Sequence, residues 1–243
     1  MKKIMLLAIG AMFVSSAYSQ INLNFEAGTS AIYGDVSENK RLREKNIWGE
    51  ELIFIGSKYL SVMPEYDITE HASIMGGVRV VVNNTNYNVG DGSFAYWRYD
   101  EQGTNTYCYR IENIEQQSIF LGVPFVAKWS VRGHSVKVSP FFKAGVAFNF
   151  NLSQEIDVDM LDESLEDECA HRIKNEISTS SFYFNEWLSA GVDFGEKNKF
   201  SFEIIFPTII LGKSPTKLCD DTGFGFGAVF SWRMPLITNN SNN

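Results

Sequence analysis

The sequence predicts an all-β protein, an eight-stranded antiparallel up-and-down transmembrane β-barrel with long external loops. Three features lead to this prediction: apolar residues alternate in eight stretches, the connections alternate between long and short, and the apolar faces are too bulky for a narrow interior. The alternation is clearest at 136–152, where every even position from Val136 to Leu152 is apolar. The odd positions are small, polar or cationic, except for Phe141. Because side chains alternate between the two faces of a strand, this repeat predicts a strand with one apolar face.

The beginning of the chain has the three parts of a secretory signal peptide. Lys2 and Lys3 form a charged start, an apolar run covers 4–14, and a small-x-small sequence at 17–19 precedes Gln20. We therefore predict a cleaved signal peptide at 1–19, a barrel at 20–236 and a polar tail at 237–243. No later stretch reaches the roughly 18 apolar residues of a spanning helix. An exported chain of this kind is either soluble in the periplasm or a barrel in the outer membrane.

The first four predicted strands cover 21–33, 59–68, 72–83 and 118–131. The first has its apolar residues at odd positions such as Leu23 and Phe25. The second and third have them at even positions, although Pro64 costs the second strand a ladder hydrogen bond. The fourth carries apolar residues at odd positions from Ile119 to Val131.

The other four predicted strands cover 136–152, 181–194, 200–211 and 223–236. The strand at 181–194 keeps an apolar face apart from Glu186, which does not fit the pattern. The last two each carry three Phe on the apolar face: Phe200, Phe202 and Phe206 in one, and Phe224, Phe226 and Phe230 in the other. Tight turns at 69–71, 132–135 and 195–198 alternate with long segments. An even strand count with short periplasmic turns and long external loops is typical of outer-membrane barrels, and places both chain ends on the periplasmic side.

The volume of the apolar faces indicates which way they point. An eight-stranded barrel has an interior just wide enough for side chains to fill, so on the order of forty bulky apolar groups must face outward toward lipid. The opposite face is rich in Gly, Ser and Asn, and its charges balance. A plugged, salt-bridged lumen without a wide pore is therefore predicted, with five acids against five bases: Glu26, Glu65, Asp67, Asp193 and Glu203 against Arg79, Lys128, Lys137, Lys143 and Arg233.

The remaining composition limits the chemistry. The net charge is −8, and removal of Lys2 and Lys3 makes it −10, which argues against nucleic acid as a partner. In an oxidising compartment the three loop cysteines predict a disulfide between two of Cys108, Cys169 and Cys219. No metal-ligand spacing and no catalytic set is readable, so we expect no metal, no cofactor and no enzyme activity.

Three segments resemble a known family, the PorT-like outer-membrane β-barrels of the Bacteroidota. The sequence SIFLGVPFVAK at 118–128 is similar to that family's central strand, and Lys143-Ala144-Gly145 is similar to the small corner of the next strand. The sequence GAVFSW at 227–232 resembles the C-terminal signal read by the barrel assembly machinery. The resemblance implies an outer-membrane location and, because the founding member belongs to a secretion system, a link to protein secretion.

The expected function is a structural or interaction role carried by the external loops. The expected partners are outer-membrane lipids, the barrel assembly machinery during insertion, and proteins of the envelope. Two alternatives stay open at this point. One is a small transport or lipid-modifying outer-membrane barrel, and the other is a soluble lipocalin-like binding barrel with its apolar residues inside.

Overall fold

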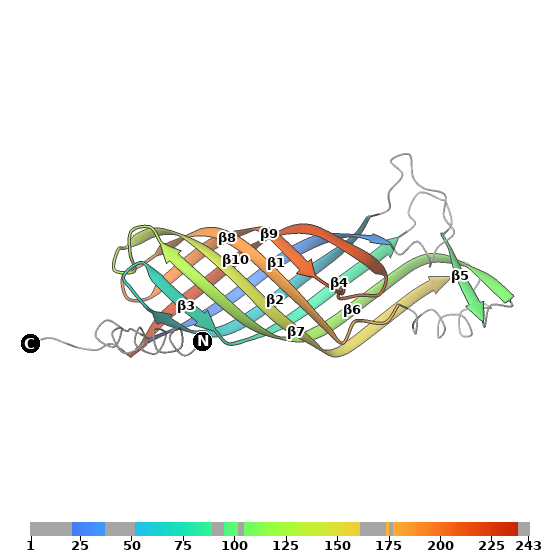
Figure 1. Ribbon diagram of the computed structural model, residues 1–243, viewed down its shortest axis with the longest axis horizontal. Helices are drawn as coiled ribbons and strands as arrows, with labels where there is room; N and C mark the ends of the chain where they lie inside the picture. Colours follow the sequence, from blue (N-terminus) through green and yellow to red (C-terminus); the bar gives the residue numbers. More distant parts are fainter. Residues whose placement is uncertain are drawn as a thin grey trace, which may run out of the picture.

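The computed structural model describes residues 21–36, 52–88, 95–101, 105–160, 174 and 177–237. Within these residues the chain forms one antiparallel sheet of ten strands (Figure 1). The strands are β1 (Ile21–Val36), β2 (Leu52–Asp67), β3 (Ala72–Gly76), β4 (Val78–Asn88), β5 (Ala95–Glu101), β6 (Asn105–Ser130), β7 (Val138–Met160), β8 (Phe182–Phe194), β9 (Lys199–Leu211) and β10 (Cys219–Ile237).

The sheet closes on itself as a barrel. β1 pairs with β10 on one side and with β2 on the other, so the first and last described strands are neighbours. β3 and β4 both lie between β2 and β6 and share one position, while β5 pairs with β6 outside the ring. The ring of described strands therefore has eight positions, which confirms the predicted barrel.

The two ends of the barrel differ. Short connections at 68–71, 131–137 and 195–198 lie at the end where β1 starts and β10 finishes, which we call the turn end. The opposite end, the loop end, carries the longer connections and the projecting β5, β6 and β7 (Figure 1). The predicted signal peptide at 1–19 and all of the predicted tail beyond Ile237 lie outside the described residues.

The division between β3 and β4 has a local cause. Pro64 of β2 has no N–H to donate, and it lies opposite this break. A Cβ added to Gly77 would come within 2.1 Å of the Val62 carbonyl oxygen, so only glycine permits this approach. Gly77 still donates its N–H to the Pro124 oxygen of β6 at 3.3 Å, which keeps the two segments in one strand position.

Several strands continue past their predicted ends. The prediction treated 84–117 as a loop, whereas β4 reaches Asn88, β5 covers 95–101 and β6 begins at Asn105. In the same way, β7 runs to Met160 and β2 starts at Leu52. A strand that projects beyond a membrane needs no apolar outer face. Its backbone ladder therefore continues after the sequence alternation that predicted it has ended.

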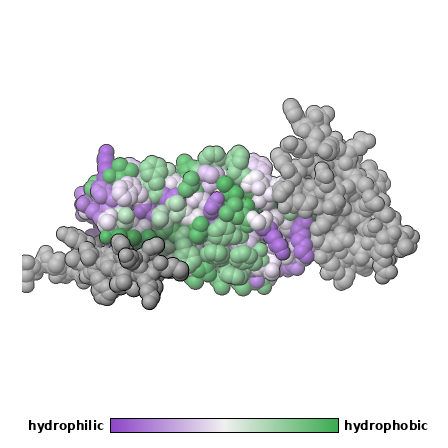
Figure 2. Space-filling model, viewed as in Figure 1, coloured by the Kyte–Doolittle hydropathy of each residue, from purple (hydrophilic) through white to green (hydrophobic). Residues whose placement is uncertain are grey.

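The outer wall of the barrel is an apolar band. Large side chains point outward and are about half exposed, among them Phe142 (58%), Ile204 (57%) and Phe230 (54%). Figure 2 shows the band as the hydrophobic middle of the molecule, with polar residues toward each side. Only lipid accepts such a surface. The lipocalin-like alternative is therefore wrong, because it requires these side chains to lie inside. No helix within the described ranges has the length and hydrophobicity needed to cross a bilayer.

Candidate functional site

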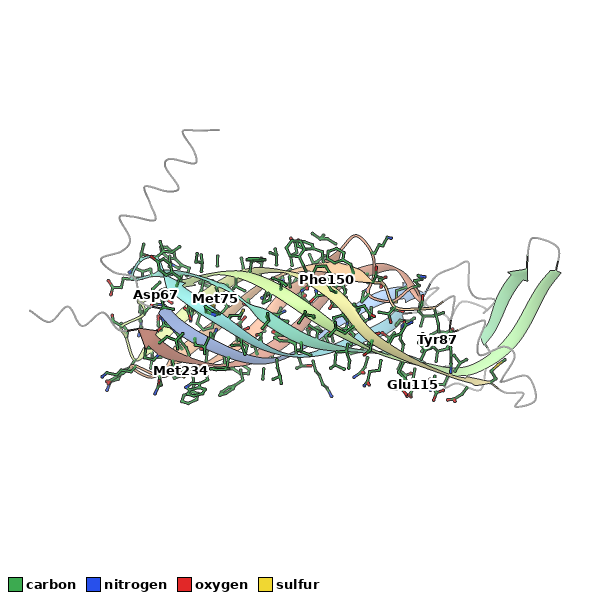
Figure 3. The ribbon with its side chains drawn as sticks, turned by 90° about the horizontal axis from the view of Figure 1, so that it is seen from below. Asp67, Met75, Tyr87, Glu115, Phe150 and Met234 are labelled. Atoms are coloured by element: carbon green, nitrogen blue, oxygen red, sulfur yellow. The ribbon has the colours of Figure 1, made fainter. Side chains whose placement is uncertain are left out.

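The lumen is the candidate functional site, because it gathers nearly all the buried charge of the described chain. Nine of the ten predicted lumen residues lie inside with at most 6% exposure: Glu26, Glu65, Asp67, Arg79, Lys128, Lys143, Asp193, Glu203 and Arg233. They come from all eight strand positions of the ring, so closure of the barrel brings them together. In Figure 3, Asp67 and Met75 lie toward the turn end, while Tyr87 and Glu115 lie toward the loop end.

Lys137 is the exception and corrects the prediction. The strand predicted from 136 begins only at Val138 as β7, so Lys137 belongs to the preceding turn. Its side chain is 74% exposed and pairs with Glu196 at 2.7 Å outside the lumen.

Lys199 takes the missing place inside. It is 2% exposed and donates from Nζ to the Val136 carbonyl oxygen at 3.0 Å. Sequence reasoning ended the hairpin turn at 198 and began the strand at Phe200. The available signal was the spacing of two from Ser201 and Glu203, which also point inward. With Lys199 in place of Lys137, five acids again face five bases.

Lys143 is the centre of one cluster of buried charges. Its Nζ lies 2.8 Å from Glu26 Oε1 and 2.6 Å from Glu203 Oε2. Ser189 donates to Glu203 at 2.5 Å, and Asn24 donates to Glu26 at 3.2 Å. One lysine from β7 thus holds carboxylates from β1 and β9, two strands separated by β10, and hydroxyl and amide donors stabilise the extra negative charge.

A second group of charges lies nearer the turn end. Lys128 contacts both oxygens of Asp193, at 3.0 and 2.7 Å, and Ser201 donates to the same carboxylate at 2.6 Å. Arg233 places Nε 3.2 Å from Glu65 Oε2 and Nη2 2.6 Å from Asp67 Oδ2. These contacts join strands that are far apart in the sequence.

Glu65, Asp67 and His134 have the composition of a metal site. Each offers one donor atom, and the three atoms lie within 4.8 Å of one another. Arg233 already contacts both carboxylates, however, and its positive charge would oppose a cation there. His134 Nε2 lies 3.6 Å from Asp67 Oδ1. Burial, helped by Arg233, lowers the pKa of His134 to about 4, so this contact is not an ion pair at neutral pH.

Aromatic side chains fill the middle of the lumen. Arg79 lies over the rings of Tyr59 and Trp187, 4.1 and 4.7 Å from their centroids. A Cβ on Gly145 would come 2.3 Å from the Trp187 ring, so glycine makes room for that indole. Phe141, the exception in the sequence pattern, is 1% exposed, and its ring centroid lies 4.4 Å from Lys128 Nζ and 5.2 Å from Lys143 Nζ. An aromatic ring on the polar face thus contacts two buried cations and fills part of the lumen.

Segments from two connections close the loop end. Ile177 and Leu218 are fully buried in an apolar cluster with Ile53, Ile55, Tyr87, Ile114, Val158, Met160 and Cys219. Gln116 of β6 donates to the Ile177 oxygen at 3.1 Å and to Thr179 at 2.9 Å, and it accepts a hydrogen bond from Thr216. Sequence reasoning missed this plug because neither connection shows strand or helix periodicity.

The predicted disulfide falls mostly on residues outside the described part. The side chain of Cys108 and the whole of Cys169 lie outside it. Cys219 is described and is 3% exposed within the apolar cluster.

No protein-family model and no curated protein matches this sequence. Solved structures similar to it include Neisserial surface protein A, at 10% identity and a TM-score of 0.36, covering 89% of this chain and 97% of that chain. The N-terminal β-barrel domain of Pseudomonas aeruginosa OprF has 12% identity, a TM-score of 0.30, and coverages of 88% and 98%. The translocator domain of the autotransporter NalP from Neisseria meningitidis has 6% identity, a TM-score of 0.28, and coverages of 96% and 94%. This chain is an outer-membrane β-barrel by its own geometry: a closed antiparallel ring, an apolar outer band and short turns at one end.

Proposed function

We propose that this protein is a closed outer-membrane barrel that anchors an external interaction platform, without a wide pore and without enzyme activity. The observation that carries the proposal is the filled lumen. Following the asymmetry of outer-membrane barrels, the turn end faces the periplasm and the loop end faces outward.

The described part of the lumen is occupied over its whole length. Charge clusters around Arg233 and Lys143 occupy the turn-end half, and Arg79 with its two aromatic rings follows them. Above these, the apolar cluster and the Gln116 hydrogen bonds hold the connections in the mouth. The charges of the turn-end half are paired, Arg79 is covered by two aromatic rings and the mouth is apolar, which favours a structural interior over a path for ions.

The platform is the extension of β5, β6 and β7. β6 and β7 stay paired as far as Ile111 and Met160, and β5 pairs with the outermost part of β6. Outward side chains such as Glu115, Asp157 and Asp159 are exposed and acidic. A paired sheet holds these groups in fixed positions, as recognition of an envelope protein or another external partner requires. The expected partners of the apolar band are outer-membrane lipids. During insertion, the expected partner is the assembly machinery that reads the last strand.

Single-channel recording in planar lipid bilayers tests the closed lumen. The wild-type protein should give no stepwise current. A variant with Arg79→Ala, Tyr59→Ala and Trp187→Ala empties the middle layer and should conduct, which shows that the assay detects an opened barrel of this kind. Steady channels from the wild type would contradict the closed lumen and favour the transport alternative.

A role in protein secretion is a second candidate, favoured by the resemblance of 118–128 to the PorT-like central strand. In this candidate the platform contacts a component of the export apparatus. Deletion of the gene should then reduce a defined set of proteins in the culture medium, and re-expression of the full chain should restore them. An unchanged set of exported proteins would contradict the secretion role and leave the anchor proposal standing.

A further inference from the structure

Two charged side chains interrupt the lipid-facing surface of the barrel. Glu186 of β8 lies between the outward residues Phe184 and Leu188. Lys58 of β2 is exposed and lies two residues before the outward Leu60. Across the described residues, no hydrogen bond or ion pair reaches either side chain. Ionisable groups in contact with lipid are costly and usually have a partner, so this pair needs an explanation.

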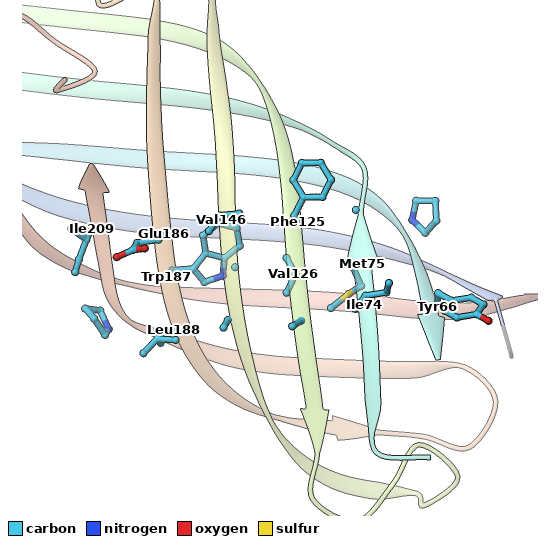
Figure 4. Close-up of a pocket in the computed structure, with 16 residues that line it drawn as sticks. Tyr66, Ile74, Met75, Phe125, Val126, Val146, Glu186, Trp187, Leu188 and Ile209 are labelled. Atoms are coloured by element: carbon cyan, nitrogen blue, oxygen red, sulfur yellow. The ribbon is translucent and has the colours of Figure 1, made fainter. Parts of the chain in front are cut away.

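Each of the two charges lies at a hollow in the wall. Glu186 lines a hollow of about 880 Å³ whose other walls are mainly apolar, including Val146, Leu188 and Ile209 (Figure 4). Lys58 lines a second hollow of about 710 Å³ with Leu60, Val80, Val82 and Phe230. The hollows give a side chain from a neighbouring molecule room to reach the wall.

The two charges lie at matching depth in the band. Its loop-end edge is marked by the aromatic pairs Tyr33–Phe54 and Phe150–Phe182, with ring centroids 5.1 and 5.3 Å apart. Lys58 is four residues from Phe54 along β2, and Glu186 is four residues from Phe182 along β8. At about 3.3 Å per residue and a tilt of about 45°, both side chains leave the backbone about 9 Å inside that edge.

The two charges also lie on opposite walls. Around the eight positions of the ring, β2 and β8 are four positions apart in either direction. Two upright copies in one membrane can therefore bring Lys58 of one against Glu186 of the other. In a twofold-symmetric dimer, the same wall of both copies would form the contact. Lys58 would then face Lys58, or Glu186 would face Glu186.

We propose that copies of this chain associate side by side in the membrane through an ion pair between Glu186 of one copy and Lys58 of the next. The contact joins opposite walls, so each added copy leaves one charge available at each end, and the assembly is an open row. A lysine can extend its long chain toward the lipid headgroups, but a glutamate is too short to cover the same depth. The short side chain of Glu186 is therefore the reason why we infer a protein partner and not a lipid headgroup. This inference goes beyond the proposed anchoring function and does not depend on the identity of any external partner.

Energy transfer between full-length copies in lipid vesicles tests the row. Copies carry a donor or an acceptor fluorophore at the C terminus, and transfer is measured against surface density. Glu186→Lys and Lys58→Glu should each raise the density needed for half-maximal transfer at least about tenfold. An equal mixture of the two variants pairs opposite charges again and should restore transfer. The double variant, which exchanges the two charges within one copy, should restore it as well.

The neutral variants Glu186→Gln and Lys58→Met keep the side-chain shape and should weaken association in the same direction. Lys137→Glu is the matched control, because it reverses an exposed charge outside the band and should leave transfer unchanged. A change in electrophoretic mobility on heating verifies that each variant is folded. Transfer at the level of random packing in the wild type, wild-type transfer in either folded single variant, or no restoration in the mixture would each overturn the proposal.

Discussion

At the scale of single residues, Lys143 decides whether two buried carboxylates are compensated. Lys143→Met leaves Glu26 and Glu203 inside the barrel without the cation that contacts both. Removing one partner of a buried ion pair is strongly destabilising, so we expect a loss of about 3–5 kcal/mol in the free energy of unfolding. Urea unfolding in detergent micelles, followed by tryptophan fluorescence, measures it.

The matched control for this prediction is Lys137→Met. Lys137 also contacts a glutamate, but both side chains are mostly exposed, at 74% and 65%. Exposed ion pairs contribute less than about 1 kcal/mol, so this variant should unfold close to the wild type. Equal losses in the two variants would contradict the buried cluster.

His134 should make the stability depend on pH. Its pKa is lowered to about 4 in the folded protein, against about 6.5 in an unfolded chain. Between pH 4 and 6.5 the unfolded state therefore binds more protons than the folded state. The contribution of His134 to the free energy of unfolding is complete above pH 6.5 and is lost as the pH falls toward 4. His134→Asn should lack this part of the decline. We would measure both proteins by urea unfolding from pH 4 to 8, and parallel curves would contradict the prediction.

At the scale of the strands, interior glycines fix how closely neighbours pack. Gly145→Ala places a methyl group 2.3 Å from the Trp187 ring, so the indole or the backbone must move. Overpacking of this kind costs about 1–3 kcal/mol. Gly56→Ala is the control, because the nearest atom to its added Cβ is 3.7 Å away. Unfolding midpoints should fall for the first variant and change little for the second.

The strands also show what the sequence could predict. Alternation located the membrane-embedded part of each strand, because lipid on one side and a packed lumen on the other impose opposite demands on successive residues. Strand ends were less predictable. The strand predicted from 136 starts at Val138, which had placed Lys137 inside, and the strand predicted from 200 starts at Lys199, which had left that lysine out. The plug around Gln116 and Ile177 depends on contacts between distant connections, for which the sequence carries no periodic signal.

At the scale of the whole molecule, the position of the apolar band determines how much an outward charge costs. Ile204 lies near the middle of β9 and is 57% exposed, while Val138 is the first residue of β7 at the turn-end edge and is 44% exposed. An arginine on the lipid face costs about 2–4 kcal/mol at the bilayer midplane and about 0–1 kcal/mol near the interface. Ile204→Arg should therefore destabilise the protein in lipid vesicles far more than Val138→Arg.

The same two variants distinguish lipid from packing as the cause. Both side chains are similarly exposed, so loss of contacts within the barrel is similar for both. The two sites differ mainly in their depth in the bilayer. The difference in the free energy of unfolding between the two variants should therefore persist in vesicles with different headgroups and increase with the thickness of the hydrocarbon layer. Urea unfolding in vesicles measures the two free energies, and equal losses would show that the band does not lie in hydrocarbon. Since Glu186 and Lys58 lie within this band, the measured depth dependence also determines how strongly each of these charges favours a partner over lipid.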